Sequence, residues 1–148
     1  MEKIIITATA ESIEQVIELL EAGVDRIYVG EKHFGLRFPH TFSYDELREI
    51  SDLVHEAGKE IVVAVNALMH QEMMDKIKPF LDFLTEIQTD YITVGDAGVF
   101  YVVNRDQYPF KTIYDASTMV TSSRLINFWG QKAGASEAVF SVDRKSVV

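Results

Sequence analysis

The sequence predicts an α/β fold of parallel βα repeats, in the form of a partial (incomplete) TIM-barrel-like sheet with about six strands. Short runs rich in Ile and Val alternate with longer amphipathic segments along the chain. Three amphipathic segments end on Ala-Gly and lead at once into an apolar run, around residues 22–25, 57–60 and 133–137. Alternating strands and helices with short connections are typical of right-handed βαβ units and a parallel sheet.

Six apolar runs are the expected strands, at residues 3–7, 25–29, 60–65, 90–94, 111–114 and 137–142. The third run is continuous in Ile and Val, as in a strand whose two faces are both covered. The expected helices lie between the strands, at about 12–22, 44–57, 72–87, 97–103 and 122–134.

Local signals mark the ends of these helices. Ser12 to Gln15 and Ser43 to Glu46 have the capping-box pattern, in which two side chains satisfy free amides at a helix start. Gly23 and Gly58 follow the first two helical patterns, where glycine commonly ends a helix. Pro79 interrupts the third pattern, so we expect a kink or a late helix start there.

The chain has 148 residues, whereas an eight-stranded barrel typically needs about 250. No glycine-rich turn follows the first expected strand, which argues against a dinucleotide-binding fold. We therefore interpret residues 1–148 as a single domain that forms the N-terminal part of a longer barrel. The first and last strands of such a part would be exposed edges, or would pair with another copy in a homo-oligomer.

Composition narrows the class of function. The chain has no cysteine, so it can supply no disulfide, no thiolate metal site and no cysteine ligand to an iron–sulfur cluster. The net charge of −9 argues against a broad nucleic-acid surface, although a local basic pocket remains open. Nothing in the sequence has the length of a membrane span or the pattern of a signal peptide, so we expect a cytoplasmic protein.

Polar side chains follow the ends of three expected strands. They are Asn66, Asp96, Asp115, Ser117 and Thr118. Because strand ends of a barrel meet on one face, we expect Asp115 and Asp96 to be catalytic and to divide acid and base roles, with the other three binding substrate. Asp96 could instead cap the following helix, and Ser117 and Thr118 could likewise act as caps. Ser117 has no histidine near it in sequence and is not interpreted as a nucleophile.

The loop after the second expected strand also collects polar side chains. Gly30 and Gly35 have the spacing of a phosphate-binding loop, but the Lys-Ser/Thr pair of that motif is absent, so we interpret both glycines as shaping the loop. Arg37 could hold a carboxylate or phosphate with two hydrogen bonds, or form a surface ion pair. Glu31 is a further candidate for substrate binding.

A metal site in this loop is a weaker interpretation. Glu31, His33 and His40 are metal-binding residue types, but their spacing matches no helical ligand motif. We assign no metal ligand, and the sequence leaves a divalent metal open as a cofactor.

Several stretches together resemble the collagenase-like peptidases of family U-thirty-two. They are Leu20 to Gly30, Phe34 to Arg37, Val65 to Leu68, Val94 to Val99 and Asp115 to Thr118, in the family's order and at compatible spacing. The chain departs from the family at residues 7–10, Thr-Ala-Thr-Ala, where Ala-Pro-Ala-Gly is usual.

The resemblance implies a barrel-like fold and a peptidase of unassigned catalytic type. It also implies relatives that assist hydroxylation of RNA bases or of quinone precursors, some with an iron–sulfur cluster held by cysteines in a later part of the chain. Two functions therefore follow. One is a peptidase or hydrolase acting on peptides from the strand ends, with a divalent metal left open as its cofactor. The other is an accessory protein that binds a small organic acid through Arg37. A fragment without activity of its own is the third reading.

Overall fold

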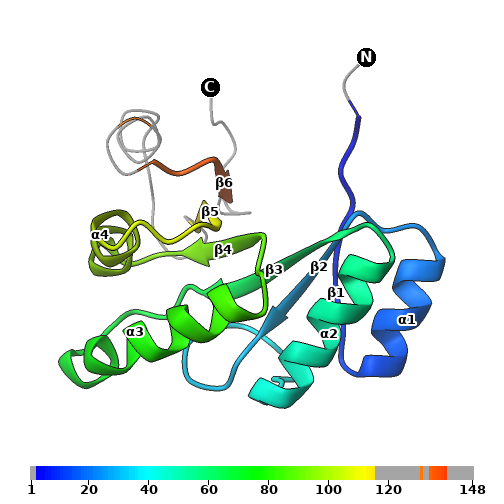
Figure 1. Cartoon of the computed structure of the whole chain (residues 1–148), viewed down its shortest axis with the longest axis horizontal. Coiled ribbons are helices and arrows are strands. Elements are labelled where there is room, and N and C mark those ends of the chain that lie inside the picture. Colours follow the sequence, from blue (N-terminus) through cyan, green and yellow to red (C-terminus); the bar gives the residue numbers. More distant parts are fainter. Residues whose placement is uncertain (1–2, 116–130, 132–133, 140–148) are drawn as a thin grey trace.

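A computed structural model describes residues 3–115, 131 and 134–139 (Figure 1). Strands and helices alternate, as the sequence predicts. The strands are β1 (Thr7–Thr9), β2 (Arg26–Gly30), β3 (Glu60–Val65), β4 (Tyr91–Val94), β5 (Lys111–Asp115) and β6 (Glu137–Val139). The helices are α1 (Ile13–Glu21), α2 (Tyr44–Glu56), α3 (Gln71–Glu86) and α4 (Ala97–Arg105). Most of the fifth expected helix, at 122–134, and the end of the sixth strand, after residue 139, lie outside the described residues.

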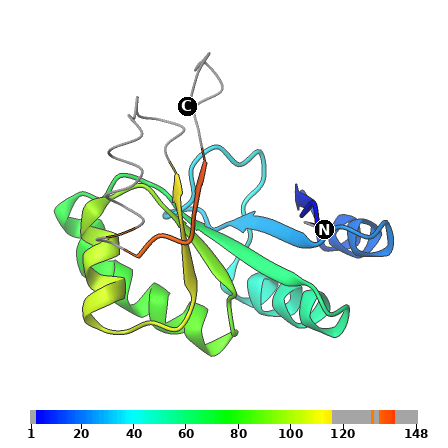
Figure 2. The same ribbon diagram turned by 90° about the horizontal axis from the view of Figure 1, so that it is seen from above.

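The six strands form one sheet in the order β1-β2-β3-β4-β5-β6, and every pair of neighbours is parallel. The sheet curls, and helices α1 to α4 lie on its outer face (Figures 1 and 2). Each strand therefore pairs with the next one in sequence, which is the strand order of a βα barrel. The architecture is a half-barrel, as predicted.

The first strand differs from its prediction. The sequence predicts a buried strand at 3–7, but β1 is Thr7–Thr9 and pairs with β2 from Thr7 opposite Arg26. Ile4, Ile5 and Ile6 are 84%, 49% and 54% exposed. The run is apolar but extends past the start of β2, so neither a neighbouring strand nor a helix of the described chain covers it. Pairing, and not hydrophobicity alone, decides where this strand lies.

The helix signals act largely as predicted. Ser43 and Glu46 form both bonds of a capping box at α2, and Ser12 accepts a hydrogen bond from the Gln15 backbone at α1. Gly23 and Gly58 follow α1 and α2 with positive φ, the backbone conformation that favours glycine. Pro79 lies inside α3, which begins at residue 71, so a late start is wrong.

The outer face of the sheet carries the main hydrophobic core. Alternate residues of each strand point outward and pack against the helices, because side chains alternate across a strand. The fully buried members include Ile27 and Val29 of β2, Ile61 and Val63 of β3, and Ile92 of β4. Helices α2 and α3 contribute Leu47, Ile50, Phe80 and Leu84.

The inner face is held together by one buried arginine. Arg26 of β2 is 5% exposed and reaches across the curl of the sheet to Glu137 of β6, with two hydrogen bonds of 2.9 and 3.1 Å. Its Nε also donates to Glu60 at 3.2 Å, and its guanidinium lies 4.1 Å from the ring centre of Tyr91. Burial alone would lower the pKa of Arg26, but the bonds to Glu137 and Glu60 outweigh it and raise the pKa overall. Arg26 therefore ties the second strand to the sixth.

No helix within the described ranges combines the length and the apolar composition that crossing a membrane requires.

Candidate functional site at the strand ends

A small cavity of about 170 Å³ lies where the curled sheet opens at the ends of its strands. It is lined by Thr9, Tyr28, Leu36, Arg37, Phe38, Asn66, Asp115 and Val139. These residues come from β1, β2, β5, β6, the loop after β2 and the residue that follows β3. The strand ends therefore converge, and we call this cavity the mouth.

Asn66 is the central polar residue of the mouth. It directly follows β3 and is 9% exposed. Its Nδ2 donates to Asp115 Oδ2 at 2.7 Å, and its Oδ1 accepts from the backbone N–H of Leu36, also at 2.7 Å. One side chain thus connects the ends of β3 and β5 to the loop after β2. Short hydrogen bonds to a buried carboxylate fix that carboxylate in place.

The two expected catalytic carboxylates have different surroundings. Asp115 is the last residue of β5, is 8% exposed and lines the mouth. Asp96 caps α4: its Oδ1 accepts from the Gly98 N–H at 2.7 Å, and its Oδ2 accepts from the Met69 N–H at 3.1 Å. Asp96 is not among the residues that line the mouth. The bond to Gly98 is that of a helix cap, which is the alternative role expected for Asp96. A catalytic role of Asp96 stays a prediction.

The loop after β2 folds back over the mouth. The Phe42 N–H donates to the Gly30 carbonyl at 3.0 Å, and the Ala67 N–H donates to the Phe34 carbonyl at 3.1 Å. A Cβ at Gly30 would lie 2.7 Å from the ring of Phe38, so a side chain at this position would require that ring to shift. These contacts agree with the interpretation that the glycines shape the loop.

Arg37 belongs to the loop after β2 and is exposed. Its φ of +66° lies in the left-handed region that few residues other than glycine adopt. In the described part of the chain, no carboxylate forms an ion pair with it. The guanidinium therefore stands at the rim of the mouth with its donors available for an anion.

Tyr28 lies on the inner face beneath the rim. Its hydroxyl is 2.9 Å from Thr93 Oγ1, and its ring meets the ring of Phe38 edge-on at 4.9 Å. Burial raises the pKa of Tyr28 to about 12, the charge of Asp115 adds to the rise, and the hydrogen bond with Thr93 opposes it. Tyr28 is thus a neutral hydroxyl at physiological pH.

This pKa predicts a loss of stability in alkali. An unfolded tyrosine loses its proton near pH 10, whereas folded Tyr28 keeps its proton to about pH 12. The unfolded chain therefore binds fewer protons between these values, and the free energy of unfolding falls as pH rises through them. Urea unfolding at several pH values should show a shallower fall for Tyr28→Phe. Tyr101→Phe is the control, because Tyr101 is 63% exposed and its variant should follow wild type. Equal slopes for all three proteins would contradict the assignment.

The structure brings Arg37, Asn66 and Asp115 together at the mouth and leaves other candidates apart. Glu31 is buried, but it binds His33 and does not line the mouth. Ser117 and Thr118 lie outside the described residues, so their substrate-binding role stays a prediction. Within the described ranges, no group of three or more His, Cys, Asp or Glu side chains could hold a metal ion.

Sequence reasoning missed Thr9, Tyr28 and Arg26. A signal was present, since Arg26, Tyr28 and Gly30 alternate with the apolar Ile27 and Val29 in one short strand. Such alternation indicates a strand with one polar face. Treating residues 25–29 as one apolar run overlooks the polar side chains that β2 places on the inner face of the half-barrel.

The fold and this mouth define the class of protein: a parallel βα half-barrel whose polar residues gather at the C-terminal ends of its strands. The family model of Peptidase family U32 matches residues 11–144. The chain belongs to that family.

The chain is similar to proteins named for RNA hydroxylation and to a solved structure named as a peptidase. The tRNA hydroxylation protein P2 of Bacillus subtilis is 29% identical over 135 residues, which cover 91% of this chain and 44% of P2. The 23S rRNA 5-hydroxycytidine synthase of Escherichia coli is 26% identical over 82 residues, covering 55% of this chain and 13% of the synthase. Among solved structures, the U32 peptidase Mk0906 matches with a TM-score of 0.74 at 15% identity, over 95% of this chain and 61% of that one. The chain thus spans less than half the length of these curated relatives.

Proposed function

We propose that this chain acts in the hydroxylation of an RNA base, in the cytoplasm, and that its mouth binds a small organic acid for that reaction. The observation that carries the proposal is the similarity to a tRNA hydroxylation protein, which extends over 91% of the chain. The family match over residues 11–144 includes the lining residues of the mouth from Tyr28 to Val139, and Thr9 lies just before it.

The geometry of the mouth supports a small anionic ligand. Arg37 at the rim offers a planar guanidinium, which can hold a carboxylate with two parallel hydrogen bonds. The volume of about 170 Å³ is below the roughly 300–1,000 Å³ that is usual for sites of drug-sized ligands. A small acid suits this space better than an extended peptide does. Tyr28 and Asn66 then offer polar contacts beneath the rim.

The proposal gives the chain a binding role. Hydroxylation needs an oxidant, and no residue here is assigned to that chemistry. An iron–sulfur cluster could not take cysteine ligands from this chain, because it has none.

Peptide hydrolysis is the second candidate, favoured by the match to the U32 peptidase Mk0906. Hydrolysis by two carboxylates would need both near one substrate, with one as acid and one as base. Asp115 lines the mouth, whereas both oxygens of Asp96 accept backbone hydrogen bonds. Peptide substrates, with and without a chelator, test this candidate. Hydrolysis that Asp115→Ala abolishes would favour it over hydroxylation.

Comparing tRNA nucleosides from cells with and without the gene tests the proposal. Total tRNA is digested to nucleosides and analysed by mass spectrometry. We expect deletion to remove a nucleoside that is one oxygen atom heavier than its parent, and reintroduction of the gene to restore it. An unchanged set of nucleosides in tRNA and rRNA would contradict the proposal.

A further inference from the structure

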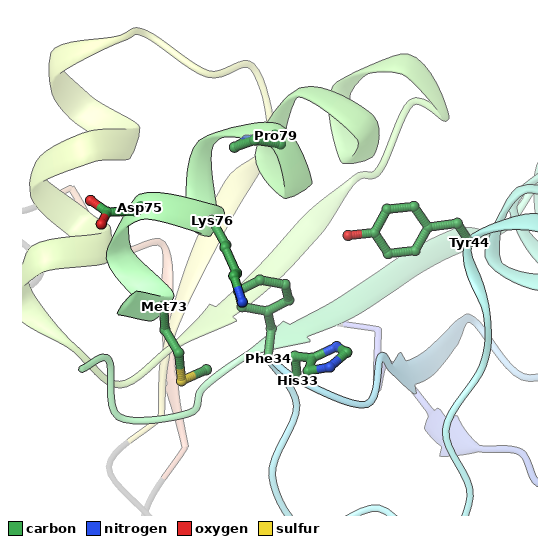
Figure 3. A pocket seen from close by; sticks show the side chains of 7 residues that line it. All are labelled: His33, Phe34, Tyr44, Met73, Asp75, Lys76 and Pro79. Carbon is green, nitrogen blue, oxygen red and sulfur yellow. The ribbon is translucent and has the colours of Figure 1, made fainter. Parts of the chain in front are cut away.

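A second cavity, separate from the mouth, lies on the outer side of the loop after β2. It measures about 440 Å³ and is lined by His33, Phe34, Tyr44, Met73, Asp75, Lys76 and Pro79. Its walls are the loop after β2, the first residue of α2, and α3 (Figure 3). The volume falls in the range that is usual for sites of small organic ligands. We call it the α2–α3 pocket.

Two aromatic rings of the pocket are held in place from behind. Phe34 stacks on Phe80 with ring centres 4.4 Å apart and 11° between the planes. Tyr44 stacks on Phe83 at 4.5 Å and 18°, yet remains 44% exposed. An exposed tyrosine that is fixed by a core ring offers a rigid aromatic face. Such faces bind planar rings at little cost in side-chain entropy.

The polar edge of the pocket is also fixed. Glu31 is 6% exposed and accepts from the His33 backbone N–H at 2.6 Å and from His33 Nδ1 at 2.8 Å. A carboxylate only accepts, so Nδ1 carries the hydrogen and Nε2 is the ring nitrogen left for a ligand. His33 itself is 68% exposed in its side chain. The buried carboxylate of Glu31 therefore fixes the orientation of the imidazole, and most of the ring stays exposed to solvent.

One cation enters the pocket. Figure 3 shows the ammonium of Lys76 directed inward from α3, opposite the hydroxyl of Tyr44, while the carboxylate of Asp75 points away. The loop beside it carries Lys32, Arg37 and His40, and Glu31 is its single acidic residue from 31 to 43. The loop therefore carries a small net positive charge, whereas the first turns of α2 and α3 beside it are acidic at Asp45, Glu46 and Glu72, and the whole chain has a net charge of −9.

We propose that the α2–α3 pocket binds one unpaired nucleotide of an RNA. The base stacks against Tyr44, its polar edge meets Nε2 of His33, and its phosphate pairs with Lys76. Recognition of unpaired RNA bases commonly combines aromatic stacking with contacts to the base edge, and basic groups track the backbone. A single pocket also reconciles RNA binding with an acidic chain, which is unsuited to a broad phosphate-binding surface.

This inference rests on the proposed function and extends it to the RNA itself. The loop after β2 forms both sites: Leu36, Arg37 and Phe38 line the mouth, and His33 and Phe34 line the α2–α3 pocket. A nucleotide in the pocket would hold its RNA beside the mouth.

Binding of a fluorescently labelled, single-stranded RNA oligonucleotide, followed by anisotropy, tests the inference. Tyr44→Leu should weaken binding roughly 5- to 150-fold, the range for loss of one base–aromatic stack, whereas Tyr44→Phe should bind as wild type does. Lys76→Met should weaken binding and reduce its dependence on salt by about one phosphate contact. Thermal unfolding of each variant confirms that it is folded.

Two controls match these variants. Tyr101→Leu removes an exposed tyrosine from α4, and Lys78→Met removes a lysine of α3 that pairs with Asp106 outside the pocket. Both should bind as wild type does. No binding by wild type, or equal binding by Tyr44→Leu, would overturn the inference. So would 4-hydroxybenzoate binding at the pocket without RNA binding, since this would assign it to an aromatic acid. These failures are separable from unchanged nucleosides on gene deletion, which overturn the proposed function.

Discussion

Replacing Asn66 by leucine is expected to lower the free energy of unfolding by about 2–4 kcal/mol. The leucine leaves the Leu36 N–H without its acceptor and removes one donor from the buried carboxylate of Asp115. Losing one partner of a buried hydrogen bond costs about 1–3 kcal/mol, and more where a charge is involved. Urea unfolding measures the loss, and an unchanged dependence on urea shows that the effect is on stability itself.

Asn66→Asp separates the two hydrogen bonds of this residue. An aspartate can still accept from Leu36, but it places a second carboxylate against Asp115. Two adjacent carboxylates favour the uptake of a shared proton, so this variant should regain stability relative to wild type as pH falls from 7 towards 5. The leucine variant should not regain it. Equal pH profiles for both variants would contradict the contact between Asn66 and Asp115.

Arg26→Met is expected to lower the free energy of unfolding by about 2–3 kcal/mol. Breaking a fully buried ion pair costs about 3–5 kcal/mol, but the side chains of Glu137 and Glu60 are 38% and 41% exposed, so water partly compensates them. Methionine keeps most of the apolar stem against Tyr91. Hydrogen exchange should then show the largest loss of protection at β6. Among the described residues, only Arg26 joins β6 to β2 by side-chain hydrogen bonds.

Arg48→Met is the matched control for this effect. Arg48 pairs with Glu86 at 3.0 Å, but the two side chains are 48% and 63% exposed. Exposed pairs typically contribute no more than about 1 kcal/mol. If both variants lose the same small amount, Arg26 does not stabilise the half-barrel in the manner described.

The central strands can be predicted from sequence because both faces of each are buried. The expected runs at 60–65 and 90–94 agree with β3 and β4 to within a residue. Continuous apolar runs of strand length, bounded by glycine and polar residues, have few alternatives. The run at Ile4 to Ile6 has the same local pattern, yet it is exposed. Whether a run is paired depends on the strand beside it, which local sequence does not encode.

The mouth is predicted in part. Arg37, Asn66 and Asp115 converge because the ends of parallel strands meet on one side of a barrel. The expected division of acid and base roles between Asp96 and Asp115 depends on where their side chains point. Asp96 accepts hydrogen bonds from two nearby backbone amides. The pairing of Arg26 with Glu137 spans 111 residues and depends on how strongly the sheet curls. Neither follows from the sequence pattern.

We propose that RNA-base hydroxylation depends on the mouth, whose Asp115 carboxylate accepts a hydrogen bond from Asn66. The most direct test is the amount of the hydroxylated nucleoside in tRNA from cells whose gene carries Asp115→Asn. This change keeps an oxygen that can accept from Asn66 but removes the charge. Glu49→Gln on the exposed side of α2 is the control. We expect Asp115→Asn to reduce the nucleoside at least about tenfold, which corresponds to roughly 1.4 kcal/mol in the limiting step, and the control to leave it unchanged. Wild-type amounts of the nucleoside in the Asp115→Asn cells, with the protein at its normal level, would contradict the account.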